Sequence, residues 1–84
     1  MNSDVANTVK EIIGNRLHVP GEAVRPYASF VNDLGADSLR LVELTLCFEE
    51  AFDIDIEDED VETLRTVQDA IDYVEQHVAA KRRS

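Results

Sequence analysis

The chain has 84 residues, 18 acidic and 8 basic side chains, a formal net charge of −10, and 44% hydrophobic residues. This length predicts one domain with a small core, and the negative charge argues against binding to nucleic acid or anionic lipid. The single Cys47 excludes an intramolecular disulfide, and the lack of an apolar leader or long charge-free run predicts a soluble cytoplasmic protein without membrane insertion.

The first predicted helix covers residues 4–17, with Ser3 as its N-cap. Its apolar face consists of Val5, Val9, Ile12, Ile13 and Leu17. Residues 18–36 form a long loop, because Pro20-Gly21 and Pro26 are turn signals. The residues expected to anchor this loop in the core are Val24, Phe30, Val31 and Leu34.

The second predicted helix begins at Asp37 or Ser38 and runs to about Phe52. Its buried stripe is expected to contain Leu41, Leu44, Phe48 and Phe52. A second, partly separate apolar stripe consists of Leu39, Val42 and Leu46, with acidic residues beside it. Cys47, among apolar neighbours, is interpreted as a reduced, partly buried thiol.

Residues 58–63 predict a short helix around Val61, and residues 67–80 predict the last helix. Thr66 and Asp69 have the spacing of a reciprocal capping box at the start of this last helix. Its apolar face consists of Val67, Ala70, Ile71, Val74 and Val78. The sum is an all-α, small four-helix bundle with three longer helices, one short helix and a long first loop. It forms a single domain over residues 1–84, with a frayed basic tail over residues 79–84.

The negative charge is concentrated between residues 33 and 62. This segment contains twelve acids and one base, Arg40, and therefore carries −11. Asp53, Asp55 and Glu57 alternate as at the start of an EF-hand loop. The sixth and twelfth positions of such a loop need glycine and glutamate, but here they hold Asp58 and Leu64. We therefore predict no dedicated metal site.

Ser38 lies where the loop turns into the second helix. A hydrolase would need a base beside this hydroxyl, but the histidines are His18, in the loop, and His77, expected on the exposed side of the last helix. We therefore predict no catalytic residue. Since Asp37 can serve as the N-cap, the free N–H groups of the first turn can accommodate an anion attached to Ser38. This argument leaves simple phosphorylation and a larger phosphodiester both open.

Several segments, in order, resemble the bacterial acyl carrier protein family. They are "VKEIIG" (9–14), "ASFVND" (28–33), "DLGADSL" (33–39), "VEL" (42–44), "EEAFDI" (49–54) and "TVQDAIDYV" (66–74). The resemblance implies a four-helix carrier that is not an enzyme. It also implies that a phosphopantetheinyl transferase attaches 4′-phosphopantetheine from coenzyme A to Ser38, between the contacting residues Asp37 and Leu39. Acyl groups would then be carried as thioesters to acyl-transferring, condensing and reducing enzymes of fatty-acid or related lipid biosynthesis.

We expect partners to dock on the acidic second helix of a monomeric carrier. The expected contacts from the residue pattern are Arg40, Val42 and Leu46, and the resemblance adds Asp37, Glu43, Glu49, Glu50, Ile56 and Asp58. An acyl pocket is expected between the second and third helices, lined by Leu44, Phe48, Val61, Leu64 and Ile71.

Two residues depart from the family pattern. Glu57 replaces a frequent proline, and it still suits the helix dipole. Arg40 replaces an acid, and it is expected to pair with Asp37 and Glu43 on the helix surface. Arg40 keeps open a specialised acyl or polyketide pathway. An acidic interaction module that is never modified is the alternative from another functional class.

Overall fold

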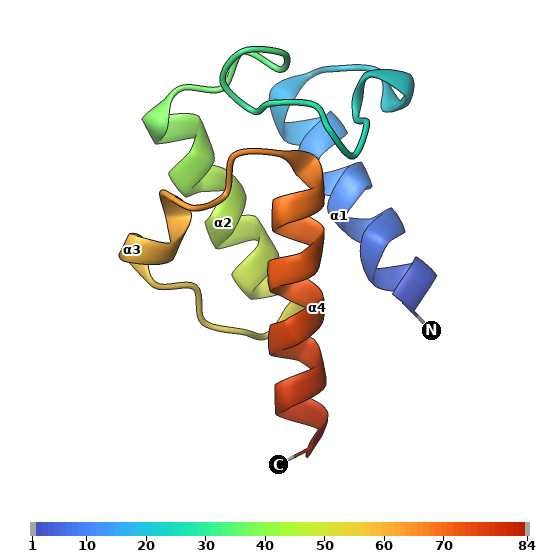
Figure 1. The fold of residues 1–84 in the computed structure, drawn as a ribbon, viewed down its shortest axis with the longest axis vertical. Coiled ribbons are helices and arrows are strands. Elements are labelled where there is room, and N and C mark those ends of the chain that lie inside the picture. The colour runs from blue at the N-terminus through green and yellow to red at the C-terminus, as the bar shows by residue number, and fades with distance from the viewer. Residues whose placement is uncertain (1, 84) are drawn as a thin grey trace.

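The computed structural model describes residues 2–83, and it describes side-chain burial for residues 4–81. Within residues 2–83 the elements are α1 (Asn2–Leu17), the 3-10 helix η1 (Gly21–Ala23), α2 (Ser38–Phe52), α3 (Asp58–Val61) and α4 (Val67–Arg83). No strand forms in this part of the chain; an isolated bridge joins Ser29 and Thr66. The predicted all-α bundle with one short helix is confirmed (Figure 1).

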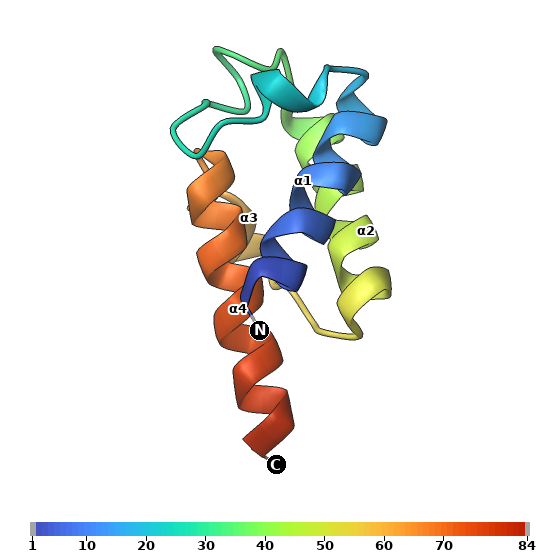
Figure 2. The ribbon, with the colours of Figure 1, turned by 90° about the vertical axis from the view of Figure 1, so that its right-hand side faces the viewer.

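Helix α1 runs antiparallel to α2 and α4, as Figures 1 and 2 both show. It packs against both of these helices, while the short α3 contacts α2. The first loop covers the end of the bundle at which α2 and α4 begin. This arrangement places the start of α2 at a rim formed by the loop and by the connection between α3 and α4.

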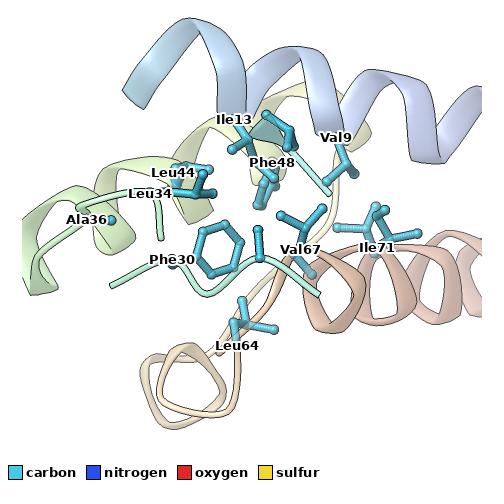
Figure 3. Packing of buried hydrophobic residues seen from close by; sticks show 14 of the residues in the cluster. Val9, Ile13, Phe30, Leu34, Ala36, Leu44, Phe48, Leu64, Val67 and Ile71 are labelled. Atoms are coloured by element: carbon cyan, nitrogen blue, oxygen red, sulfur yellow. The ribbon is translucent and has the colours of Figure 1, made fainter. Parts of the chain in front are cut away.

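The core draws apolar side chains from every long helix and from the loops (Figure 3). Phe30, Phe48, Ile13, Leu44, Val9, Val67 and Val74 are its largest fully buried side chains. The connecting segments contribute Ile54, Ile56 and Leu64. Burial of such side chains contributes about 1.5–3 kcal/mol each, so the core is the main source of stability.

The first loop is held against the start of α4 by backbone hydrogen bonds. Phe30 N donates to Arg65 O at 3.0 Å, Val67 N to Ala28 O at 3.1 Å, and Gln68 N to Pro26 O at 2.9 Å. The loop also contains η1, which the sequence patterns did not predict. Three of its four expected core anchors are buried, namely Val24, Phe30 and Leu34. The prediction for Val31 is wrong, because this side chain is 58% exposed.

The helix ends test the capping predictions. Asp37 caps α2, because its Oδ1 accepts from the backbone N–H of Arg40 at 2.9 Å. Thr66 Oγ1 accepts from Asp69 N, and Asp69 Oδ2 accepts from Thr66 N, both at 3.2 Å, so the predicted capping box of α4 is confirmed. α1 begins at Asn2 rather than at residue 4, and the side chain of Ser3, the expected N-cap, lies outside the described residues.

Two other helix boundaries also differ from prediction. α3 ends at Val61 rather than near Thr63, because Thr63 N and Oγ1 both bond to Asp60 O in a closing turn. α4 is helical through Arg83, beyond the expected helix end near residue 80. Lys81 Nζ donates to Asp53 O at 2.7 Å and also pairs with the Asp53 carboxylate, which fastens α4 to the end of α2. Ser84 lies outside the described residues.

No helix over residues 2–83 combines the length and the apolar character that crossing a bilayer requires.

Candidate functional site

Ser38 is the first residue of α2, and a tight turn leads into it. Gly35 has a φ of 70°, in the left-handed region that glycine adopts without a clash from Cβ. Because Asp37 caps the helix, the cap does not use the Ser38 side chain. Ser38 is exposed, and no residue of the described chain hydrogen-bonds its hydroxyl. The hydroxyl is therefore presented to solvent at the positive end of a 15-residue helix.

Neither histidine is placed to activate this hydroxyl. His77 was expected to be exposed, but it is half-buried: its ring stacks on Tyr73 with centroids 4.0 Å apart. His77 Nδ1 lies 2.9 Å from Tyr73 O, so Nδ1 is the protonated nitrogen that donates to this carbonyl. His18 is exposed at the end of α1 and lies in a different depression from the cleft at Ser38.

An open cleft of about 570 Å³ lies beside Ser38. Three parts of the chain form its walls: the first loop, the first two turns of α2, and α3 with its connection to α4. Its lining residues are Ser29, Val31, Asn32, Ser38, Leu41, Val42, Asp58, Val61, Glu62, Leu64 and Arg65. The cleft therefore combines apolar walls with a serine hydroxyl and charged groups.

The cleft coincides only partly with the predicted acyl pocket. Val61 and Leu64 line it, as expected. Leu44, Phe48 and Ile71 lie in the packed core instead. In Figure 3, Leu64 points from the segment after α3 toward Phe30 and Val67. The structure thus separates the five expected pocket residues into two at the cleft and three behind it.

The predicted docking face is exposed along α2. Leu39, Val42 and Leu46 are 69%, 44% and 53% exposed, a large apolar surface for a helix beside solvent. Glu43, Glu50 and Asp58 are exposed near this stripe. These residues form a combined apolar and acidic face that continues from Ser38 along the helix.

Glu49 and Ile56 differ from the rest of the expected contact residues. Ile56 is only 8% exposed and belongs to the core cluster, so its side chain is not on the docking face. Glu49 is half-buried, and its Oε2 accepts from Ile56 N at 3.0 Å. Glu49 therefore fixes the connection between α2 and α3, a role that no pattern in the sequence indicates.

Arg40 does not make the expected ion pairs. Its Nη1 donates to the carbonyl oxygen of Arg16 at 3.5 Å, at the last turn of α1. The carboxylates of Asp37 and Glu43 form no ion pair with this guanidinium, although Asp37 Oδ1 accepts from the Arg40 backbone N–H and Glu43 lines the same depression. A cation suits this place, because the carbonyl groups at a helix C-terminus carry partial negative charge. The predicted surface pairing is wrong, and Arg40 bridges α2 to α1 instead.

Tyr73 connects α3 to α4, and sequence analysis missed this contact. Its hydroxyl donates to Asp60 Oδ2 at 2.6 Å. Burial, together with this hydrogen bond and the charge of Asp60, raises the pKa of Tyr73 to about 12. The position of Tyr73 beside the apolar face of α4 indicates partial burial, and a buried phenol needs a partner. Nothing in the sequence selects Asp60 among the many nearby acids.

Asp53, in the acidic segment, forms an ion pair with Lys81, but among the residues described this segment has no metal-binding cluster. The hydrogen bond and positive charge of Lys81 hold the pKa of Asp53 below its usual range. Within that same part of the chain, no three histidine, cysteine, aspartate or glutamate side chains gather as metal ligands.

Comparison with known families gives a match over most of the chain. The family model described as "Phosphopantetheine attachment site" matches residues 7–74, which include all of α2 and α3 and most of α1. Members of this family bind 4′-phosphopantetheine covalently and act as carrier domains rather than catalysts. The match covers most of the chain, and the helical bundle described above is consistent with it. The chain therefore belongs to the phosphopantetheine-attachment family of carrier domains.

Proposed function

We propose that Ser38 is the attachment residue and that this chain is an acyl carrier protein of the bacterial type. Carrier domains of this family interact with a phosphopantetheinyl transferase and with biosynthetic enzymes. The exposed Ser38 hydroxyl at the start of α2, on the edge of the cleft, carries the proposal. In this proposal residues 1–84 act as one carrier domain, a cytoplasmic monomer that delivers acyl groups to fatty-acid or related lipid biosynthesis.

The surroundings of Ser38 fit the prosthetic group. The hydroxyl is free of the cap and open to an incoming enzyme, with Asp37 and Leu39 exposed on either side. The transferase supplies the activation that this site lacks, so Ser38 needs only to present its oxygen. When bound, the group supplies a terminal thiol that carries acyl groups as thioesters. The cleft next to the hydroxyl gives the arm a place to lie against the protein.

The cleft also supports the proposed shelter for an acyl chain. Leu41, Val42, Val61 and Leu64 give it apolar walls, and apolar surface removed from water contributes about 25 cal/mol per Å². Leu44, Phe48 and Ile71 lie behind these walls. In this proposal a short chain lies in the cleft, while a longer chain needs α2 and α3 to part so that it reaches the buried residues.

The acidic face of α2 supports brief docking to basic enzyme surfaces. Glu43, Glu50 and Asp58 attract basic groups, and Leu39, Val42 and Leu46 add apolar contact beside the attachment residue. Acyl-transferring, condensing and reducing enzymes are the proposed partners. Arg40 interrupts this acidic face, which favours a specialised acyl or polyketide pathway as the second candidate.

Intact mass spectrometry tests the attachment. The apo protein is incubated with coenzyme A, with and without a broad-specificity phosphopantetheinyl transferase. Wild type is expected to gain one phosphopantetheine, and Ser38→Ala none. Ser29→Ala is the control, because Ser29 also lines the cleft, although its Oγ accepts from Asn32 N. Circular dichroism confirms that both variants fold. Failure of the folded wild type to gain mass with any tested transferase would overturn the proposal in favour of an unmodified acidic interaction module.

A further inference from the structure

Arg65 shares the cleft with Ser38. It lies in the connection between α3 and α4, which forms part of the cleft wall. Of the described residues that line this cleft, Asp58 and Glu62 are acidic and Arg65 alone is basic. Arg65 therefore lines the same opening as Ser38, the proposed attachment residue.

The backbone of Arg65 is firmly held. Its N–H is shared between Thr63 O at 3.1 Å and Asp69 Oδ2 at 3.2 Å. Its carbonyl oxygen accepts from Phe30 N at 3.0 Å, which joins the first loop to the start of α4. The side chain therefore extends from a fixed point, so little backbone ordering is needed before it binds an anion.

The side chain itself is not used by the fold. Arg65 is exposed, and across residues 4–81 no carboxylate forms an ion pair with its guanidinium. Arg40, in contrast, uses its guanidinium on the carbonyl oxygen of Arg16. Of these two arginines near the start of α2, only Arg65 combines an available guanidinium with a position on the cleft.

A phosphodiester on Ser38 would add negative charge to a segment that already carries −11. The start of α2 offsets part of that charge through its free N–H groups. One of the first-turn N–H groups is already used, since Arg40 N donates to Asp37 Oδ1. A second source of positive charge is therefore favourable, and a planar guanidinium suits phosphate oxygens.

We propose that Arg65 binds the phosphodiester that joins the prosthetic group to Ser38, and so directs the first part of the arm into the cleft. This inference rests on the proposed function. Arg65 acts as a positioning residue: it holds the attachment end of the arm between the start of α2 and the connection before α4. The interaction is exposed and charge-based, so added salt weakens it.

Nuclear magnetic resonance of the whole protein tests this contact. Wild type, Arg65→Gln, Arg65→Lys and the control Arg25→Gln are each converted to the phosphopantetheinylated form, and mass spectrometry confirms the conversion. Arg25 is exposed, bonds to Glu22 O and does not line the cleft, so its replacement makes the same charge change elsewhere. We expect the phosphorus resonance to shift in Arg65→Gln, to shift less in Arg65→Lys, and to coincide with wild type in Arg25→Gln.

A second observable follows the guanidinium directly. The Nε–Hε resonance of Arg65 is expected to move when apo wild type becomes phosphopantetheinylated, and to return toward its apo position in 0.5 M salt. Coincident phosphorus resonances and an unmoved Nε–Hε signal would overturn the inference. The inference would also be overturned if the Nε–Hε signal moved when a malonyl group is loaded on the arm but not on phosphopantetheinylation alone. Arg65 would then be assigned to binding the carboxylate of the carried group. Since every sample is verified as modified, these outcomes are distinct from a failure of Ser38 to accept the group.

Discussion

At the scale of single residues, the acids around α2 have different roles although they form one charged segment in the sequence. Asp37 caps the helix, Glu49 accepts from Ile56 N, and Asp53 pairs with Lys81 at a left-handed φ of 54°. Glu43 and Glu50 are exposed and have no such bond among the residues described. Replacing all these acids by alanine would therefore combine losses of stability with losses of the charge that we propose for docking.

Glu49 and Glu50 are adjacent acids that allow these two effects to be separated. Glu49→Ala removes the partner of the Ile56 N–H, so we expect a loss of about 1 kcal/mol in the free energy of unfolding. Glu50→Ala, at an exposed site, is expected to change it by less than about 0.5 kcal/mol. Urea denaturation at pH 7 measures both values.

Glu49→Gln is the variant that isolates the hydrogen bond, because its amide oxygen can still accept from Ile56 N while the charge is lost. It is expected to keep most of the wild-type stability. If Glu49→Gln were as unstable as Glu49→Ala, the carboxylate charge rather than the hydrogen bond to Ile56 would be the source of the stabilisation.

At the scale of elements, the parts that the sequence predicted are those specified by local signals. The bounds of α2 and the capping box of α4 follow from residues close together in the chain, such as Asp37 with Arg40 and Thr66 with Asp69. The contacts that position α3 join residues in different elements: Tyr73 to Asp60, 13 positions apart, and Glu49 to Ile56, 7 positions apart. Several similar acids near these positions could serve as the partner. Likewise, the cleft beside Ser38 depends on how α3 sits against α2, so its lining was only partly predicted.

Tyr73 links α3 to α4, and Tyr73→Phe removes that link while it keeps the ring that stacks on His77. At pH 7 we expect the variant to lose about 1 kcal/mol of stability. Hydrogen exchange at Val61, the last residue of α3, is expected to become faster because the short helix is held less firmly. Tyr27→Phe is the control, since Tyr27 is exposed.

The hydrogen bond between Tyr73 and Asp60 also makes the stability of the protein depend on pH. The pKa of Tyr73 is raised from 10.0 to about 12 in the folded protein. Between these two pH values the unfolded chain binds fewer protons than the folded one, so stability falls as the pH rises. Urea denaturation across this range is expected to show a steeper decline for wild type and Tyr27→Phe than for Tyr73→Phe. Equal slopes in all three proteins would contradict the role assigned to the partly buried Tyr73 hydroxyl.

At the scale of the whole molecule, the negative charge is concentrated in one segment of the chain. The segment over residues 33–62 carries −11, more than the net charge of the entire chain, and it includes the face beside Ser38. An approaching enzyme that acts on this serine must cover the start of α2, where Arg40 is the base within that segment. We therefore predict that Arg40 influences partners through its charge beside the proposed attachment residue, even though its guanidinium also bonds to the end of α1.

Charge reversal at Arg40 measures this influence. For a phosphopantetheinyl transferase with a basic docking surface, Arg40→Glu replaces a repulsive charge by an attractive one. A change of two charge units, about 10 Å from one basic group in water, alters the interaction energy by about 0.8 kcal/mol. This corresponds to about fourfold in kcat/KM at low salt. The gain is expected to disappear in 0.5 M salt, because the Debye length is then well below that distance. Arg40→Gln, which removes the charge without reversing it, is expected to give about half of this free-energy change.

The control for Arg40→Glu is Arg25→Glu, which makes an identical charge change in the first loop, outside the two depressions beside α2. This control shows whether the change in net charge alone explains a change in kcat/KM. A lower kcat/KM for a folded Arg40→Glu protein would mean that the transferase presents an acid to Arg40. Arg40 would then select partners with a mixed surface, basic toward Glu43 and Glu50 and acidic toward the start of α2. That result would favour the specialised acyl or polyketide pathway over general fatty-acid synthesis.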